Sequence, residues 1–255
     1  MEHRKLTVSA TLTVVLTALF VITETLIGIR FQTGGAPGAE LRFLTVTLAC
    51  AFCTLCAERS PVYLLTQLAL CITVAADYFL VLPPSPNQLP GMLFFSVAQL
   101  AYAARIFLTE TSPKRRRIQL WLRVSLSILA PAATFAVLGA SADPVAVVSV
   151  FYYAHLILNL IFAWMQFPRE GLLAVGFLLF LGCDTAIGLL ALNGYFAISP
   201  DSFLYTLLHP GFDLVWAFYL PSQMLLGMSL LTRRLSAQMR KKSRSDLNLS
   251  LSTEI

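Results

Sequence analysis

Three acids lie inside long apolar stretches of the chain and are the residues best placed to do chemistry: Glu24, Asp77 and Asp184. A charged side chain at the centre of a membrane-spanning helix costs at least about 2.5–3.5 kcal/mol on insertion scales, so each acid indicates a functional role. No lysine or arginine lies beside them at the same depth, and clustered carboxyl groups without a counter-ion cannot all ionise. Such a cluster combines a proton donor with a proton acceptor, which is what general acid–base hydrolysis requires.

The apolar stretches themselves predict the fold. Only 12% of the residues are charged and the mean hydropathy is +0.75, whereas a soluble domain carries about 25% charged residues. Because a helix needs about 20 apolar residues to cross a membrane, we predict an all-α membrane bundle of eight transmembrane helices in residues 1–235. A basic, disordered cytoplasmic tail is expected in residues 236–255. The predicted spans are Leu6–Ile29, Phe43–Ala57 (short unless it begins nearer Gly38), Val62–Leu82, Gly91–Leu108, Leu120–Ala140, Val145–Gln166, Leu172–Leu192 and Gly211–Thr232.

Lysine and arginine are concentrated in alternate connections between these spans. They precede the first span and follow the second, fourth, sixth and eighth, while Arg30 and Arg42 in the first outer connection are the exceptions. Because loops rich in lysine and arginine stay in the cytoplasm, both termini are predicted to be cytoplasmic. The net charge of +5 therefore reflects membrane topology and not nucleic-acid binding. A bacterial inner membrane and an endoplasmic reticulum membrane both fit this pattern.

The three acids lie on spans that all run from the inside to the outside. At a rise of about 1.5 Å per residue, they are expected roughly 7–12 Å below the outer boundary, which predicts one shared cavity in the outer half of the bundle. Polar stripes on neighbouring spans should face that cavity, because polar side chains turn away from lipid. Alternatively, they only hold helices together by hydrogen bonds. The stripe residues are Gln99, Tyr102, His155, Asn159, Tyr219 and Gln223, with Tyr152 on the same face as His155.

Two further patterns bear on the architecture and on metal binding. The segment Glu24–Gly28 echoes Asp184–Gly188, which predicts a parallel four-plus-four repeat. His155 and two aspartates could supply the three protein ligands of a catalytic zinc ion, but no spacing motif supports this. The five cysteines all fall within predicted spans and are expected to be small buried thiols. We therefore expect no metal ion and no other cofactor.

Several short motifs resemble those of the YhhN-type lysoplasmalogenase family. They are Ala76-Asp77, the segment Gly91–Tyr102 (GMLFFSVAQLAY), Asp184, and Tyr219-Leu-Pro-Ser-Gln223. The resemblance covers most of the chain and includes the plan of eight spans. The family often has glycine where this chain has Ala76, and histidine where it has Gln99.

The resemblance implies a hydrolase that cleaves the vinyl-ether bond of lysoplasmalogens. The products would be a fatty aldehyde and glycerophospho-ethanolamine or -choline. Asp77 and Asp184 would be the catalytic pair, while Glu24 and the stripe residues would bind or orient substrate or water. The implied partners are the lysophospholipid substrate and membrane lipids, and not nucleic acid.

Two other classes of function compete with this interpretation. Intramembrane acids also form proton or cation relays, so a proton- or cation-coupled transporter is one alternative. A non-catalytic, lipid-binding membrane protein is the other.

Overall fold

The computed structural model describes residues 10–33, 38–56, 60–192 and 199–231, and the regular structure in these residues is entirely helical. Eight of the described helices are long and apolar enough to cross a membrane. The prediction of an all-α bundle with eight spans is therefore confirmed. The predicted tail at 236–255 and the first residues of the chain lie outside the described residues.

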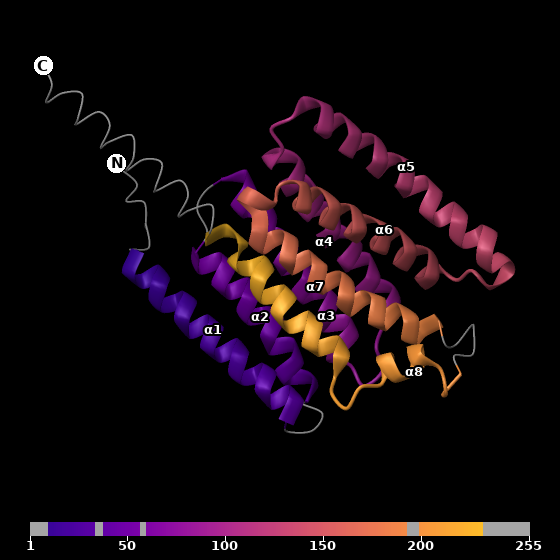
Figure 1. Ribbon diagram of the computed structural model, residues 1–255, viewed down its shortest axis with the longest axis horizontal. Coiled ribbons are helices and arrows are strands. Elements are labelled where there is room, and N and C mark those ends of the chain that lie inside the picture. The colour runs from indigo at the N-terminus through magenta and orange to yellow at the C-terminus, as the bar shows by residue number, and fades with distance from the viewer. Residues whose placement is uncertain (1–9, 34–37, 57–59, 193–198, 232–255) are drawn as a thin grey trace, which may run out of the picture.

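The eight long helices follow one another through the chain. Two shorter elements accompany them: the 3-10 turn η1 (Gly139–Ser141) after α5, and α8 (Phe203–Leu208) before the final helix. The final helix carries no label in Figure 1, where it is drawn in yellow, and we refer to it as the last helix. The long helices are α1 (Ala10–Thr33), α2 (Ala39–Cys56), α3 (Pro61–Val81), α4 (Gln88–Thr109), α5 (Pro113–Leu138), α6 (Pro144–Met165), α7 (Phe167–Leu192) and the last helix (Leu214–Leu231).

The predicted boundaries differ from the observed ones mainly at helix starts. Helix α2 begins at Ala39, so the short second span gains the residues it needs. Helix α5 begins at Pro113 and includes the basic run 114–117, because the Ser112 hydroxyl caps it by accepting a hydrogen bond from the Arg115 amide. Helix α7 is bent at Glu170, whose backbone is not helical. Helix α8 was not predicted from the sequence.

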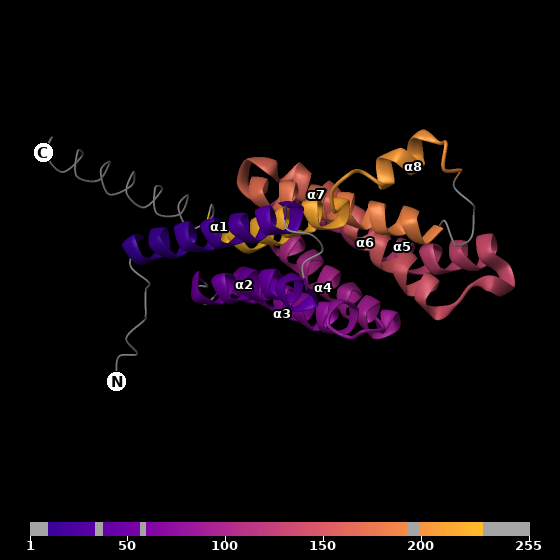
Figure 2. The same ribbon diagram turned by 90° about the horizontal axis from the view of Figure 1, so that it is seen from below.

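The long helices lie side by side along one direction (Figure 1). Seen from below, α1, the last helix and α7 form one layer, and α2, α3 and α4 form another, with α6 and α5 beside them (Figure 2). The start of α1 and the end of the last helix lie at the same end of the bundle, as an even number of crossings requires.

The surface of the bundle is apolar and its interior holds polar groups. Ile128 and Val137 of α5 are 66% and 75% exposed, whereas Asp77 and Arg105 are 3% and 0% exposed. A bilayer offers no water to satisfy polar side chains, so these must face other helices. The same arrangement concentrates the groups able to do chemistry inside the bundle.

Helices α3 and α4 approach closely at Gly91. A Cβ atom added to Gly91 would lie 2.5 Å from Leu80 Cγ, so alanine would force this pair of helices apart. We expect Gly91→Ala to lower the free energy of unfolding by about 1–3 kcal/mol, as overpacked cores do, measured by thermal unfolding in detergent. Gly188→Ala is the control, since nothing lies within 4 Å of a Cβ there. Equal stability of the two variants would contradict the prediction.

Candidate active site

Two acids from different helices come together in the interior of the bundle. Asp77 of α3 is 3% exposed and accepts a hydrogen bond of 2.7 Å from the Tyr219 hydroxyl of the last helix. Asp184 of α7 accepts a short hydrogen bond from the Tyr152 hydroxyl of α6. The rings of both phenols contact the ring of Phe180, which places the two acid–phenol pairs next to each other in the interior. We call these four residues the carboxyl–phenol site.

The helix positions place this site in the half of the bundle predicted to face outward. Asp77 lies four residues before the end of α3 and Asp184 eight residues before the end of α7, which corresponds to depths of about 6 and 12 Å. Tyr219 lies five residues into the last helix, so its hydroxyl comes from the same end of the bundle. The depth of these groups agrees with the prediction from sequence.

Aromatic rings enclose the carboxyl–phenol site. Phe180 is 1% exposed and lies one helical turn before Asp184. Its ring centroid is 6.5 Å from that of Tyr152, 5.6 Å from that of Tyr219 and 6.0 Å from that of Phe95. This apolar wall lowers the local dielectric, which strengthens hydrogen bonds and charge interactions inside it. The arrangement offers two carboxyl groups for proton transfer, each held in position by a phenol.

Gln99, His155 and Asn159 lie together, but in a separate cluster. Asn159 donates from Nδ2 to Gln99 Oε1 at 2.8 Å, and it accepts from Arg123 Nη2 of α5 at 2.7 Å. The His155 ring nitrogens lie 3.5 Å from Arg123 Nη1 and 3.1 Å from the Ser127 hydroxyl. The expectation that these residues share the cavity of the acids is therefore corrected. Helix α6 directs His155 toward α5, and it directs Asn159 toward α5 and toward Gln99 of α4.

The contacts of His155 also argue against a zinc site formed by His155 and two aspartates. His155 faces an arginine and a hydroxyl group, and not the two aspartates with which it would have to bind a metal ion. Among the described residues, no three histidine, cysteine, aspartate or glutamate side chains are grouped so as to hold a metal.

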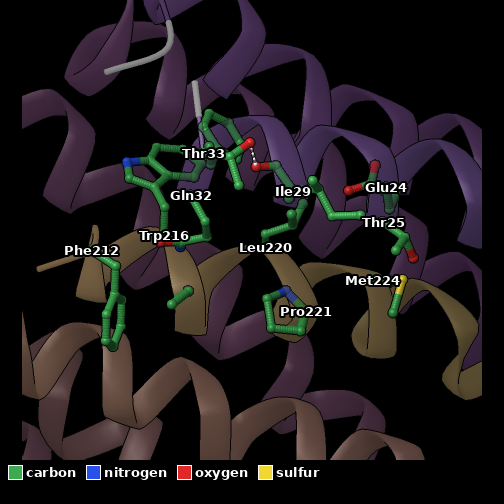
Figure 3. A pocket seen from close by; sticks show the side chains of 13 residues that line it. Glu24, Thr25, Ile29, Gln32, Thr33, Phe212, Trp216, Leu220, Pro221 and Met224 are labelled. Carbon is green, nitrogen blue, oxygen red and sulfur yellow. Dashed lines mark hydrogen bonds between the residues drawn. The ribbon is translucent and has the colours of Figure 1, made fainter. Parts of the chain in front are cut away.

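Glu24 also lies apart from the two aspartates. It is 1% exposed, and its Oε1 atom has no hydrogen-bond partner among the described residues. Figure 3 shows it toward one end of a groove between α1 and the last helix, with Trp216 and Phe212 toward the other end. The predicted cavity shared by three acids is therefore corrected to a pair of acids and a separate glutamate. The reason is that Gly28 of α1 packs directly against Leu220 of the last helix, which turns Glu24 toward that helix.

Tyr102 and Gln223 are buried, and each has one polar atom that makes no hydrogen bond among the described residues. The Tyr102 hydroxyl and Gln223 Oε1 make no hydrogen bond among the described residues, and the same holds for Gln99 Nε2. Buried polar atoms in proteins normally bind a partner, such as an ordered water or a ligand. Gln223 lies one turn beyond Tyr219, so its Cα atom lies about 6 Å further along the axis of the last helix.

Sequence reasoning missed three residues with buried polar contacts. Tyr152 lies on the same polar stripe as His155, but the sequence does not indicate that it binds Asp184. Arg105 and Arg123 both lie within predicted spans. An arginine inside a predicted span indicates a buried polar contact, because a charged side chain there is costly without a partner. Arg105 Nη2 donates to Glu170 Oε2 at 2.8 Å, and both side chains are at most 1% exposed.

Comparison with known proteins assigns the family. The model of the YhhN family matches residues 39–230, which include α2 to α7 and nearly all of the last helix. Asp77, Asp184, Tyr152 and Tyr219 lie inside the match, whereas Glu24 and the rest of α1 lie outside it. No curated protein and no solved structure matches the chain. The match covers well over half of the chain, which therefore belongs to the YhhN family, the lysoplasmalogenase family.

Proposed function

We propose that this protein hydrolyses the vinyl-ether bond of lysoplasmalogens at the carboxyl–phenol site. Membership of the YhhN family suggests a hydrolase of the lysoplasmalogenase type. The observation that supports the proposal most strongly is the pair of buried carboxyl groups, Asp77 and Asp184, each bound by a phenol whose ring contacts Phe180.

The chemistry needs one carboxylic acid and one carboxylate. The acid protonates the β-carbon of the vinyl ether, and the α-carbon becomes part of an oxocarbenium ion. The carboxylate stabilises that cation and removes a proton from the attacking water. In the hemiacetal, the carboxyl group that took the proton from water gives it to the glycerol oxygen, while the other carboxylate removes the hydroxyl proton. The carbon–oxygen bond to glycerol breaks, the alcohol leaves, and both carboxyl groups return to their starting protonation states. The other product is the fatty aldehyde, so one water is consumed for each bond broken.

A site inside the bundle suits a substrate dissolved in the membrane. The alkenyl chain of a lysoplasmalogen stays in the apolar phase while its headgroup remains at the interface. The aromatic wall around the carboxyl–phenol site would exclude bulk water, which favours interactions with developing charge in the transition state.

The hydrogen bond from each phenol is expected to orient its carboxyl group and to stabilise the negative charge on it. We expect Tyr219→Phe and Tyr152→Phe each to lower kcat for aldehyde release by about ten- to a hundredfold, the effect of one hydrogen bond to a charged group. Tyr153→Phe is the matched control, because the Tyr153 hydroxyl lies 2.7 Å from Thr185 Oγ1 and not beside a carboxyl group. Steady-state assays would measure all three variants. An equal loss in Tyr153→Phe would argue against a specific role for the phenols.

The proposed reaction itself is tested with purified protein and a defined lysoplasmalogen. We expect equal amounts of fatty aldehyde and glycerophosphoethanolamine, and no release of fatty acid from the 1-acyl lysophospholipid. In D₂O the aldehyde should carry one deuterium on the carbon next to the carbonyl group, since that carbon receives the proton. Absence of aldehyde would refute the proposal.

Separate readouts identify the two alternatives. Proton-coupled uptake into proteoliposomes without lipid turnover would indicate a transporter. Saturable binding of the lysoplasmalogen without release of aldehyde would indicate a lipid-binding protein.

A further inference from the structure

Arg42 is a cation on the side of the bundle predicted to face outward, where the charge pattern of the sequence leaves it unexplained. It lies near the start of α2, and its Nη2 atom is 3.0 Å from Asp213 Oδ2, immediately before the last helix. The two side chains are 27% and 29% exposed, so a ligand can reach both of them. An ion pair this exposed is weak, and a zwitterionic ligand could exchange partners with it.

Arg42 has hydrogen-bonding capacity that the described residues do not use. Its Nε atom is buried and has no partner among them. Its guanidinium carbon lies 5.3 Å from the ring centroid of Trp216, which holds the group in place. A guanidinium presents several N–H groups in a fixed fork, and this geometry suits phosphate.

Arg42 and Asp213 do not line the groove between α1 and the last helix, but they border one end of it through Trp216 and Gln32. The groove has a volume of about 660 Å³ and is lined mostly by apolar side chains, with Phe212 and Trp216 on either side of Asp213 in the sequence. Figure 3 shows Phe212 and Trp216 toward one end of the groove. Gln32 of α1 lines the same end, with its Nε2 atom 3.5 Å from the Asp213 carbonyl oxygen.

Trp216 connects this groove to the carboxyl–phenol site. Its ring centroid lies 5.2 Å from that of Tyr219, in an edge-to-face contact. Tyr219 in turn donates to Asp77. Trp216 thus contacts the ion pair, lines the apolar groove and adjoins the carboxyl–phenol site through the ring of Tyr219.

We infer that Arg42 and Asp213 bind the zwitterionic headgroup of the lysophospholipid, while the groove accepts its alkenyl chain. The guanidinium takes the phosphate and the carboxylate takes the ammonium group. This inference rests on the proposed function for the identity of the chain. The charge complementarity explains why a cation stands on the outer side of the bundle. In a lysophospholipid the vinyl ether is only a few covalent bonds from the phosphate, so a headgroup held here leaves the reacting bond beside Trp216, whose ring contacts Tyr219 of the carboxyl–phenol site.

The test compares two substrates with the same alkenyl chain: the phosphoethanolamine lysoplasmalogen and the alkenylglycerol that lacks a headgroup. Arg42→Gln is expected to raise KM for the first by about tenfold or more, with little change in kcat, and to leave KM for the second unaltered. Arg42→Lys keeps a charge for Asp213 but loses the planar fork of N–H donors that suits phosphate, and should give an intermediate KM. Arg30→Gln is the matched control, since Arg30 is an exposed arginine near the end of α1 and is not the partner of Asp213 in the ion pair. Equal changes for both substrates would overturn the inference.

Asp213→Asn gives an independent test of the ammonium contact. It should weaken use of the phosphoethanolamine substrate relative to an alkenyl lysophosphatidate, whose headgroup carries no ammonium group. An unaltered preference between these two substrates would contradict the assignment of Asp213.

Binding separates a failure of this inference from a failure of the proposed function. The probe is a 1-alkyl ether lysophosphoethanolamine, which has no vinyl-ether bond to hydrolyse. It should raise the unfolding temperature of the wild type and of Arg30→Gln, but raise that of Arg42→Gln much less. If the wild type releases no aldehyde yet shows this difference, the headgroup site stands and the proposed reaction is wrong. If the wild type releases aldehyde but the probe stabilises all variants equally, the headgroup site is wrong.

Discussion

Asparagine at Asp77 or at Asp184 is expected to lower kcat for aldehyde release by about 10²–10⁴-fold, the usual contribution of a positioned acid or base. Asparagine has nearly the same size as aspartate, and its carbonyl oxygen can still accept the hydrogen bond from Tyr219 or Tyr152. The substitution therefore removes proton transfer and negative charge while it keeps the local contacts. Steady-state kinetics on the lysoplasmalogen would measure the loss.

The double variant sharpens this prediction. Residues that act as one unit have strongly non-additive effects, so Asp77→Asn with Asp184→Asn should be little slower than the worse single variant. Asp201→Asn is the control, because Asp201 is an exposed acid in the turn before α8. Near wild-type release of aldehyde by both single variants would exclude the two-acid mechanism. Independent, multiplicative losses would indicate that the two acids do not act together.

Glutamine at Arg105 is expected to cause the largest loss of stability, about 3–5 kcal/mol, because it removes one partner of a buried ion pair. Arg105 joins four helices: it bonds Glu170 at the start of α7, the Thr66 hydroxyl of α3 at 3.0 Å and the Ser229 hydroxyl of the last helix at 2.7 Å. The loss would be measured as a lower midpoint of unfolding in detergent. Arg115→Gln is the control, since that arginine is 40% exposed in its contact with Glu110 and should cost less than about 1 kcal/mol.

A second variant tests whether the loss comes from the charge left behind. Arg105→Met combined with Glu170→Met removes both charges, and such apolar replacements of buried pairs are often nearly neutral. The two hydroxyl groups keep their own acceptors, because Thr66 donates to the Val62 carbonyl and Ser229 to the Leu226 carbonyl. We therefore expect the double variant to recover most of the stability. A double variant as unstable as Arg105→Gln would show that the arginine acts chiefly through packing.

The positions of the spans were predictable because hydropathy is a local property. The transfer of about 20 apolar residues into a bilayer depends on those residues alone, and all eight predicted spans correspond to observed helices, with the start of α5 as the largest difference. The same reasoning drew attention to Asp77 and Asp184, since a charge inside a span is costly wherever the helix stands in the bundle. The start of α5 was missed because its cap at Ser112 precedes a basic run that hydropathy assigns to a loop.

What the sequence determined by itself is the set of helices and the presence of acids within them. The tertiary structure alone decided which polar groups meet. Asp77 and Asp184 bind phenols whose rings both contact Phe180, Glu24 faces the groove, and Asn159 turns toward Gln99 and Arg123. The rotation of each helix about its axis sets these contacts, and it depends on close packing such as that of Gly91 against Leu80. Packing of this kind is a property of two helices at once, and the periodicity of one helix does not specify it.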